Sequence, residues 1–156
     1  MDKNTQNAHI DIAYATFCAA QFSQAAPSCI TRAIGAMLNV LPTAWRVVGM
    51  TPLAHRMLKG ADKELPKGVT RAHVVSRTAT LREVLTGPEL SRDEFVETFL
   101  GKADQTLLCG PRENNERIAR RDDIMWFENA GDDPLFQDRS LKARFGPAER
   151  SFIANF

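Results

Sequence analysis

The side chains with the clearest chemical capability lie between residues 70 and 117 of this 156-residue chain. His73 ends a β-branched, apolar run, and Asp104, Gln105 and Asn114 follow further along the chain. A neutral imidazole can accept a proton from water near neutral pH. Amide and carboxylate oxygens are the hard ligands that Mg²⁺ prefers. Together these residue types could support metal-assisted hydrolysis.

Two short strands and a helix are expected to position these side chains. The run VTRAHVV at 69–75 and the run TLLC at 106–109 have the composition of strands. Pro111 is expected to begin a charged helix that reaches about Arg121, because proline suits the first helical position. This helix would carry Asn114 in its first turn.

The insert between the two strands is predicted to be helical. A short helix is expected at 80–85 and is closed by Gly87 and Pro88. A second helix begins at a capping box, in which Ser91 and Glu94 can each bind the other's backbone amide. It is expected to end at Gly101.

Further helices are predicted outside this segment. An apolar helix is expected at 9–25, ended by Pro27, and Ser28 can cap another that runs to about Leu41. Thr51 and Pro52 together are typical of a helix start, here of a helix to 58 or 59. A final helix turn is expected from Pro147.

The order of strand, His73, helical insert, strand and helix resembles the HNH nucleases, whose site is a ββα-metal hairpin and helix. The segment 70–77 (TRAHVVSR) looks like the family's strand, which ends in histidine followed by two apolar residues. The segment 105–117 (QTLLCGPRENNER) looks like the family's second block, with Gln105 in its first asparagine position and Asn114 nine residues later.

This resemblance implies an α+β fold, mostly helical with a short β-hairpin and helix, and metal-dependent hydrolysis of phosphodiester bonds in DNA or RNA. It makes His73 the general base and Asn114 a metal ligand, with Mg²⁺ as the expected ion, while Gln105 braces the loop of the catalytic site. Arg112 or Arg117 would contact phosphate. Ala72 stands where many members have an acidic or histidine ligand. The metal could then be held by Asn114 with waters and a substrate phosphate, or by Asp104 or Glu113, or the site could be degenerate and only bind nucleic acid.

Each of these residues also has an ordinary structural interpretation. His73 could be a strand histidine bound to a backbone carbonyl, and Asn114 could be a polar residue of a first helical turn. Arg71 and Arg77 belong to a basic set that looks like a groove for nucleic acid, but acidic residues interleave with it, as on a solvated surface. The scaffold could also bind nucleic acid as a regulator without a metal.

The N-terminal third differs from the rest in charge. Residues 12–31 contain no charged side chain, whereas the chain after residue 60 is densely charged. We expect an N-terminal helical segment at 1–60 and an HNH-like domain with a C-terminal extension at 61–156, or one compact domain formed by both. An alternative function follows from the uncharged stretch: a noncatalytic helical protein that docks a partner, or a second copy of itself, through residues 12–45.

The overall composition excludes several protein classes. A net charge of +1 argues against polybasic binding of nucleic acid, and no P-loop, coenzyme fingerprint or HExxH motif is present. Three cysteines without a CxxC pair favour a reducing compartment, so we expect a cytoplasmic protein. Polar residues such as Gln21 and Pro27 interrupt the uncharged stretch, so no membrane span is expected.

Overall fold

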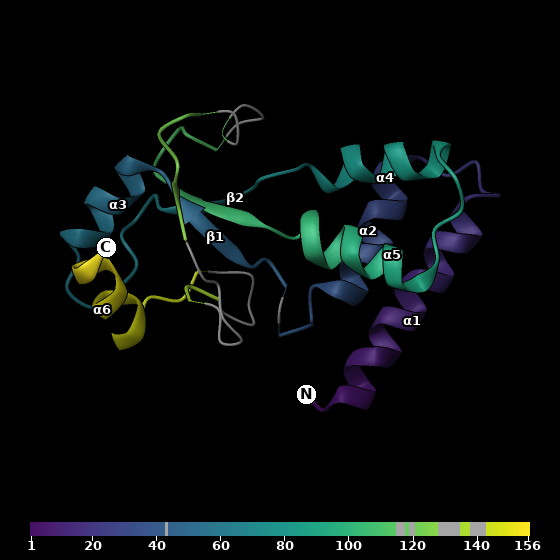
Figure 1. The fold of residues 1–156 in the computed structure, drawn as a ribbon, viewed down its shortest axis with the longest axis horizontal. Coiled ribbons are helices and arrows are strands. Elements are labelled where there is room, and N and C mark those ends of the chain that lie inside the picture. Colours follow the sequence, from purple (N-terminus) through teal and green to yellow (C-terminus); the bar gives the residue numbers. More distant parts are fainter. Residues whose placement is uncertain (43, 115–117, 119–120, 128–134, 138–142) are drawn as a thin grey trace. The chain divides into compact units, whose positions relative to one another are not determined.

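A computed structural model describes residues 1–42, 44–114, 118, 121–127, 135–137 and 143–156, which form a mixed α+β fold (Figure 1). The chain forms two compact units, and each of them is built from two separate segments. Unit 1 comprises Met1–Ala44 and Val75–Asp104, and unit 2 comprises Trp45–Val74 and Gln105–Phe156. The chain therefore passes three times from one unit to the other.

This division differs from the boundary expected near residue 60. Residues 45–60 supply strand β1 (Val47–Met50) and helix α3 (Pro52–Lys59) to unit 2, and residues 75–104 belong with the N-terminal helices in unit 1. The physical reason is the packing of the insert: its apolar side chains Leu81, Phe95 and Phe99 complete the core formed by the N-terminal helices. The distribution of charge along the sequence does not reveal that residues 75–104 pack with the N-terminal helices.

Unit 1 consists of helices. These are α1 (Lys3–Ala20), α2 (Pro27–Leu38), α4 (Arg77–Thr86) and α5 (Arg92–Val96), which continues as the π-helical segment η1 (Glu97–Lys102). The capping box predicted at the start of α5 is confirmed, because the Ser91 hydroxyl accepts from the Glu94 amide and the Glu94 carboxylate accepts from the Ser91 amide.

The first two helices have different limits from those expected. Helix α1 begins at Lys3 because the Asp2 carboxylate accepts a hydrogen bond from the Thr5 amide at 2.9 Å, which caps the helix. Pro27 begins α2 instead of only ending the helix before it, since proline at the first helical position loses no hydrogen bond.

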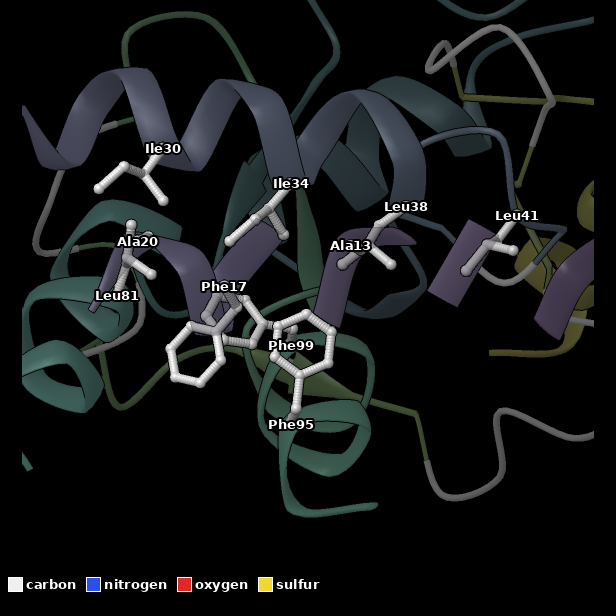
Figure 2. Packing of buried hydrophobic residues seen from close by; sticks show 10 residues of the cluster. All are labelled: Ala13, Phe17, Ala20, Ile30, Ile34, Leu38, Leu41, Leu81, Phe95 and Phe99. Atoms are coloured by element: carbon white, nitrogen blue, oxygen red, sulfur yellow. The ribbon is translucent and has the colours of Figure 1, made fainter. Parts of the chain in front are cut away.

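The core of unit 1 is aromatic and aliphatic. Figure 2 shows Phe17 of α1 beside Phe95 and Phe99, with Ile34 and Leu38 pointing from α2 into the same cluster. The ring centroid of Phe95 lies 5.4 Å from that of Phe17 and 4.7 Å from that of Phe99. From the uncharged N-terminal stretch, Ala13, Phe17, Ala20 and Ile30 are buried in this core, whereas Ile12 and Phe22 are exposed. No helix in the described part of the chain is long and apolar enough to cross a membrane.

Unit 2 contains a four-stranded sheet in the order β2-β3-β1-β4. Strand β2 (Thr70–His73) pairs antiparallel with β3 (Thr106–Cys109), as the hairpin interpretation predicted, and β1 runs parallel to β3. The short strand β4 (Met125–Trp126) pairs antiparallel with β1. Neither β1 nor β4 was predicted.

Two helices cover apolar parts of this unit. Helix α3 starts as predicted, with the Thr51 hydroxyl accepting from the Ala54 amide at 3.1 Å. Helix α6 (Pro147–Asn155) is also confirmed and contributes Ile153 to a core that includes Met50, Leu58 and Leu108.

The charged helix expected from Pro111 does not begin there. Residues 111–113 form a turn, and Arg112 has φ +67°, which a right-handed helix excludes. The turn is closed by Glu113, whose carboxylate accepts from the Gly110 amide at 2.9 Å and from the Thr51 hydroxyl at 2.5 Å. Residues 115–117 and 119–120 of the expected helix lie outside the described residues.

Candidate functional site

His73 is positioned by the β2–β3 pair. It is the last residue of β2 and lies opposite Thr106, and the next residue, Val74, donates its amide to the Gln105 carbonyl at 2.9 Å. Alternate residues of a strand share one face, so Arg71 and His73 project to the same side of the sheet. His73 is half-buried there.

The imidazole of His73 packs against an aromatic ring. Its centroid lies 4.3 Å from that of Trp45, in an edge contact with an interplanar angle of 60°. The guanidinium carbon of Arg71 lies 5.5 Å from the same indole centroid. Trp45 therefore contacts both side chains that β2 presents on this face, although it lies far from them in the sequence.

Arg71 does not occupy an open surface. The residue is 8% exposed, and its Nη1 donates to the Trp45 carbonyl oxygen at 3.1 Å. This placement leaves little of the guanidinium for the phosphate contact expected from the sequence. It instead joins β2 to the segment that precedes β1.

Asn114 follows the turn at 110–113 and is brought to β2. Its Nδ2 atom donates a long hydrogen bond of 3.5 Å to the carbonyl oxygen of Arg71, two residues before His73. The side chain is otherwise exposed. Because this bond uses the amide nitrogen, Oδ1 is the atom that could serve as a ligand or acceptor.

Glu113 fixes the turn that carries Asn114. Besides Thr51 and Gly110, its carboxylate binds Arg121 Nη1 at 2.6 Å. Burial acts to raise the pKa of Glu113, but hydrogen bonds from Thr51, Gly110 and Arg121 outweigh it and lower the pKa below its ordinary value. Glu113 is therefore ionised and bound to protein donors, which corrects the expectation that it could serve as a free metal ligand.

Asp104 belongs to a buried ion pair in unit 1. Its fully buried carboxylate forms an ion pair with Arg77 Nη2, and Arg77 Nη1 donates to Asn39 Oδ1 at 2.7 Å. Burial lowers the pKa of Arg77 to about 10, so the guanidinium is still charged at neutral pH. Asp104 and Arg77 are therefore partners of each other. The sequence had suggested Asp104 as a metal ligand and Arg77 as a contact to phosphate.

The remaining site residues predicted from the sequence are Gln105, Arg112 and Arg117. Gln105 is half-buried, and its backbone carbonyl accepts a hydrogen bond from the Val74 amide. Arg112 is exposed in the turn beside Asn114. Arg117 lies outside the described residues.

The described residues fit a divalent cation only in part. None of them form a group of three or more histidine, cysteine, aspartate or glutamate side chains that could hold an ion. Asn114 Oδ1 is a hard oxygen atom near β2, whereas Asp104 and Glu113 are bound to protein cations. A Mg²⁺ site of this kind would depend on waters and a substrate phosphate for its other ligands.

Two residues beside His73 were missed by sequence reasoning. These are Trp45, which precedes β1 by two residues, and Thr106 of β3. No local spacing links either residue to His73, because the sequence does not predict β1 as a strand of the same sheet. Comparison of the chain with models of known protein families, with curated proteins and with solved structures gave no match.

Proposed function

We propose that this protein hydrolyses phosphodiester bonds of nucleic acid at a site centred on His73, similar to the site of HNH nucleases. The observation that carries the proposal is the antiparallel β2–β3 pair, which ends at His73 and is followed by a turn that brings Asn114 to β2. Strand, histidine, second strand and asparagine thus meet within one unit of the protein.

The chemistry assigned to His73 is general-base catalysis. A half-buried imidazole at the end of a strand can accept a proton from a water that attacks phosphorus, since its ordinary pKa lies close to neutral pH. When bound, a divalent cation would neutralise charge on the scissile phosphate and stabilise the leaving oxygen. Asn114 Oδ1 is the described atom that would help to hold it.

Among the described arginines that the sequence predicts to contact nucleic acid, Arg112 is the exposed one. It is exposed, and it lies in the turn two residues before Asn114, whereas Arg71 and Arg77 are largely buried against protein partners. A phosphate near Asn114 would therefore meet Arg112 first. This assignment replaces the broader basic groove suggested by the sequence.

The docking function is less well supported by the fold. Within residues 12–45, Ala13, Phe17, Ile34 and Leu38 are buried in the core of unit 1, so those side chains are not available to a partner. Ile12, Phe22 and Val40 are the large apolar side chains of this segment that remain exposed among the described residues.

The proposal is tested by incubating the protein with plasmid DNA and with mixed RNA in Mg²⁺, Mn²⁺ or EDTA. We expect metal-dependent cleavage by the wild type and by His9→Ala, a matched histidine variant in α1. His73→Ala should lose about 10²-fold or more in rate, as expected for removal of a general base, and Asn114→Ala should need more Mg²⁺ for the same rate.

Folding and nucleic-acid binding should be unchanged in His73→Ala, as measured by circular dichroism and by fluorescence anisotropy with a labelled oligonucleotide. Equal cleavage by the wild type and His73→Ala would refute the role of His73. Absence of cleavage with every metal would reject the proposed function and direct attention to protein partners.

A further inference from the structure

Trp45 has a backbone conformation that is unusual for a large side chain. Its φ is +59°, in the left-handed region, which L-residues with a bulky side chain rarely adopt. Such conformations persist only where surrounding contacts impose them, and they are common at functional sites. The contacts around Trp45 are therefore informative.

The backbone of this segment is tied to both strands of the hairpin. The Trp45 carbonyl oxygen accepts from Arg71 Nη1 of β2 at 3.1 Å and also lies 3.1 Å from the Thr106 hydroxyl of β3. The Thr106 amide donates to the Arg46 carbonyl at 2.8 Å, and Thr106 is fully buried. The two strands thereby hold the left-handed turn in place.

The result of this turn is the position of the indole ring. The ring lies at contact distance from the imidazole of His73, while the guanidinium of Arg71 packs over the same indole. An imidazole that is flanked by a fixed aromatic ring has fewer side-chain rotamers available to it. A tryptophan that only filled the core would not need a strained backbone that brings its ring against a half-buried histidine.

We infer that Trp45 is a positioning residue for His73: it holds the imidazole in one orientation so that the same ring nitrogen stays directed at the reacting water. This inference rests on the proposed function. General-base catalysis requires the base within hydrogen-bond reach of the proton, so loss of orientation slows the chemical step more than it weakens substrate binding.

The test uses substitutions that separate the ring from the backbone. Trp45→Asn removes the ring but keeps a residue type that tolerates the left-handed conformation. Trp45→Phe keeps an aromatic ring. The matched control is Trp126→Asn, because Trp126 is an exposed tryptophan of β4 outside the proposed site.

We expect Trp45→Asn to lower kcat by about 10-fold or more with KM changed by no more than about twofold. Trp45→Phe should recover most of the rate, and Trp126→Asn should match the wild type. A second measurement is independent of activity: the ring carbon-bound protons of His73 should carry an aromatic ring-current shift in NMR spectra, and Trp45→Asn should abolish it.

The outcomes separate this inference from the proposed function. An active wild type together with a folded Trp45→Asn variant of equal kcat, or with His73 ring resonances that do not move, overturns the positioning role alone. A reduced kcat that Trp45→Phe does not recover also counts against it. A wild type that cuts no substrate overturns the proposed function, and the catalytic sense of this inference falls with it.

Discussion

At the scale of single residues, burial decides whether a charged side chain is available for chemistry. Asp104 is fully buried and bound to Arg77, which is itself largely buried and also bound to Asn39. Each charge of this pair depends on the other, because an isolated ion in such a place is strongly unfavourable. We therefore assign Asp104 to the stability of unit 1.

Asp104→Ala should lower the free energy of unfolding by about 3–5 kcal/mol, the usual cost of leaving one buried charge without its partner. Urea denaturation followed by circular dichroism measures this. The matched control is Asp11→Ala, which removes an exposed pair with Arg92 and should cost less than about 1 kcal/mol. A stable Asp104→Ala variant with a changed metal requirement would instead restore Asp104 as a ligand.

Sequence reasoning predicted those parts of the candidate site that depend on residues close together in the chain. His73 at the end of a strand and its pairing with the second strand follow from short runs of residue types, and both were found. The partners of Asp104, Glu113 and Trp45 come from distant segments, so no spacing in the sequence indicates them. Asn114 was expected in the first turn of a helix, whereas it follows a turn and its Nδ2 donates to the Arg71 carbonyl of β2.

At the scale of elements, the start of α6 depends on one buried carboxylate. Glu149 accepts from the Gly146 amide at 2.8 Å, from the Phe136 amide at 3.2 Å and from Arg144 Nε at 2.8 Å. Burial acts to raise the pKa of Glu149, but these hydrogen bonds outweigh it and lower the pKa below its ordinary value of 4.5. The ionised carboxylate thus fixes both the helix start and the segment at Phe136.

Glu149→Gln should lower the free energy of unfolding at pH 7 by about 1.5–3 kcal/mol, the range for hydrogen bonds to a charged group. The folded-state pKa is depressed, so the contribution of Glu149 is present above pH 4.5 and is lost as the pH falls through the folded-state value. The difference between variant and wild type should therefore shrink between pH 7 and pH 3 in urea denaturation.

Glu89→Gln is the control for this pH series, because Glu89 is exposed and should change stability little at either pH. A difference between Glu149→Gln and the wild type that stays constant with pH would show that the carboxylate charge does not carry the effect.

An element can be predicted from the sequence when the residues that define it are neighbours in the chain. The caps at Thr51 and Ser91 and the proline starts of α3 and α6 involve neighbouring residues, and each was predicted. Strand β1 contains Gly49, where an added Cβ would come within 2.9 Å of the Met125 carbonyl oxygen. The glycine weakens the sequence signal for a strand, yet the close approach of β4 requires it.

At the scale of the whole molecule, residues 75–104 are an insertion within a hairpin. His73 lies opposite Thr106, and Val74 still donates to Gln105, so the two strands are already close enough for a short turn. The insertion belongs with the N-terminal helices of unit 1, with which it shares a core.

A shortened chain should therefore fold as unit 2 alone. We expect a variant that lacks 1–44, and in which Asn-Gly replaces 75–104, to give a cooperative thermal transition and dispersed NMR signals, since Asn-Gly favours two-residue hairpin turns. A chain lacking only 1–44 should aggregate and bind an apolar dye, because Leu81, Phe95 and Phe99 lose their partners. A well-folded 45–156 fragment would contradict this.

The interleaving of the two units also constrains the order in which the chain can fold during its synthesis. Helices α1 and α2 leave the ribosome before α4, α5 and η1, which carry the side chains that complete their core. Strands β1 and β2 similarly precede β3, which lies between them in the sheet. The core of unit 1 cannot close until Phe99 has been made, and the core of unit 2 cannot close until Ile153 of α6 has been made. Apolar helix faces and unpaired strand edges are therefore exposed on the nascent chain, and we expect its yield in cells to depend on chaperones that cover them.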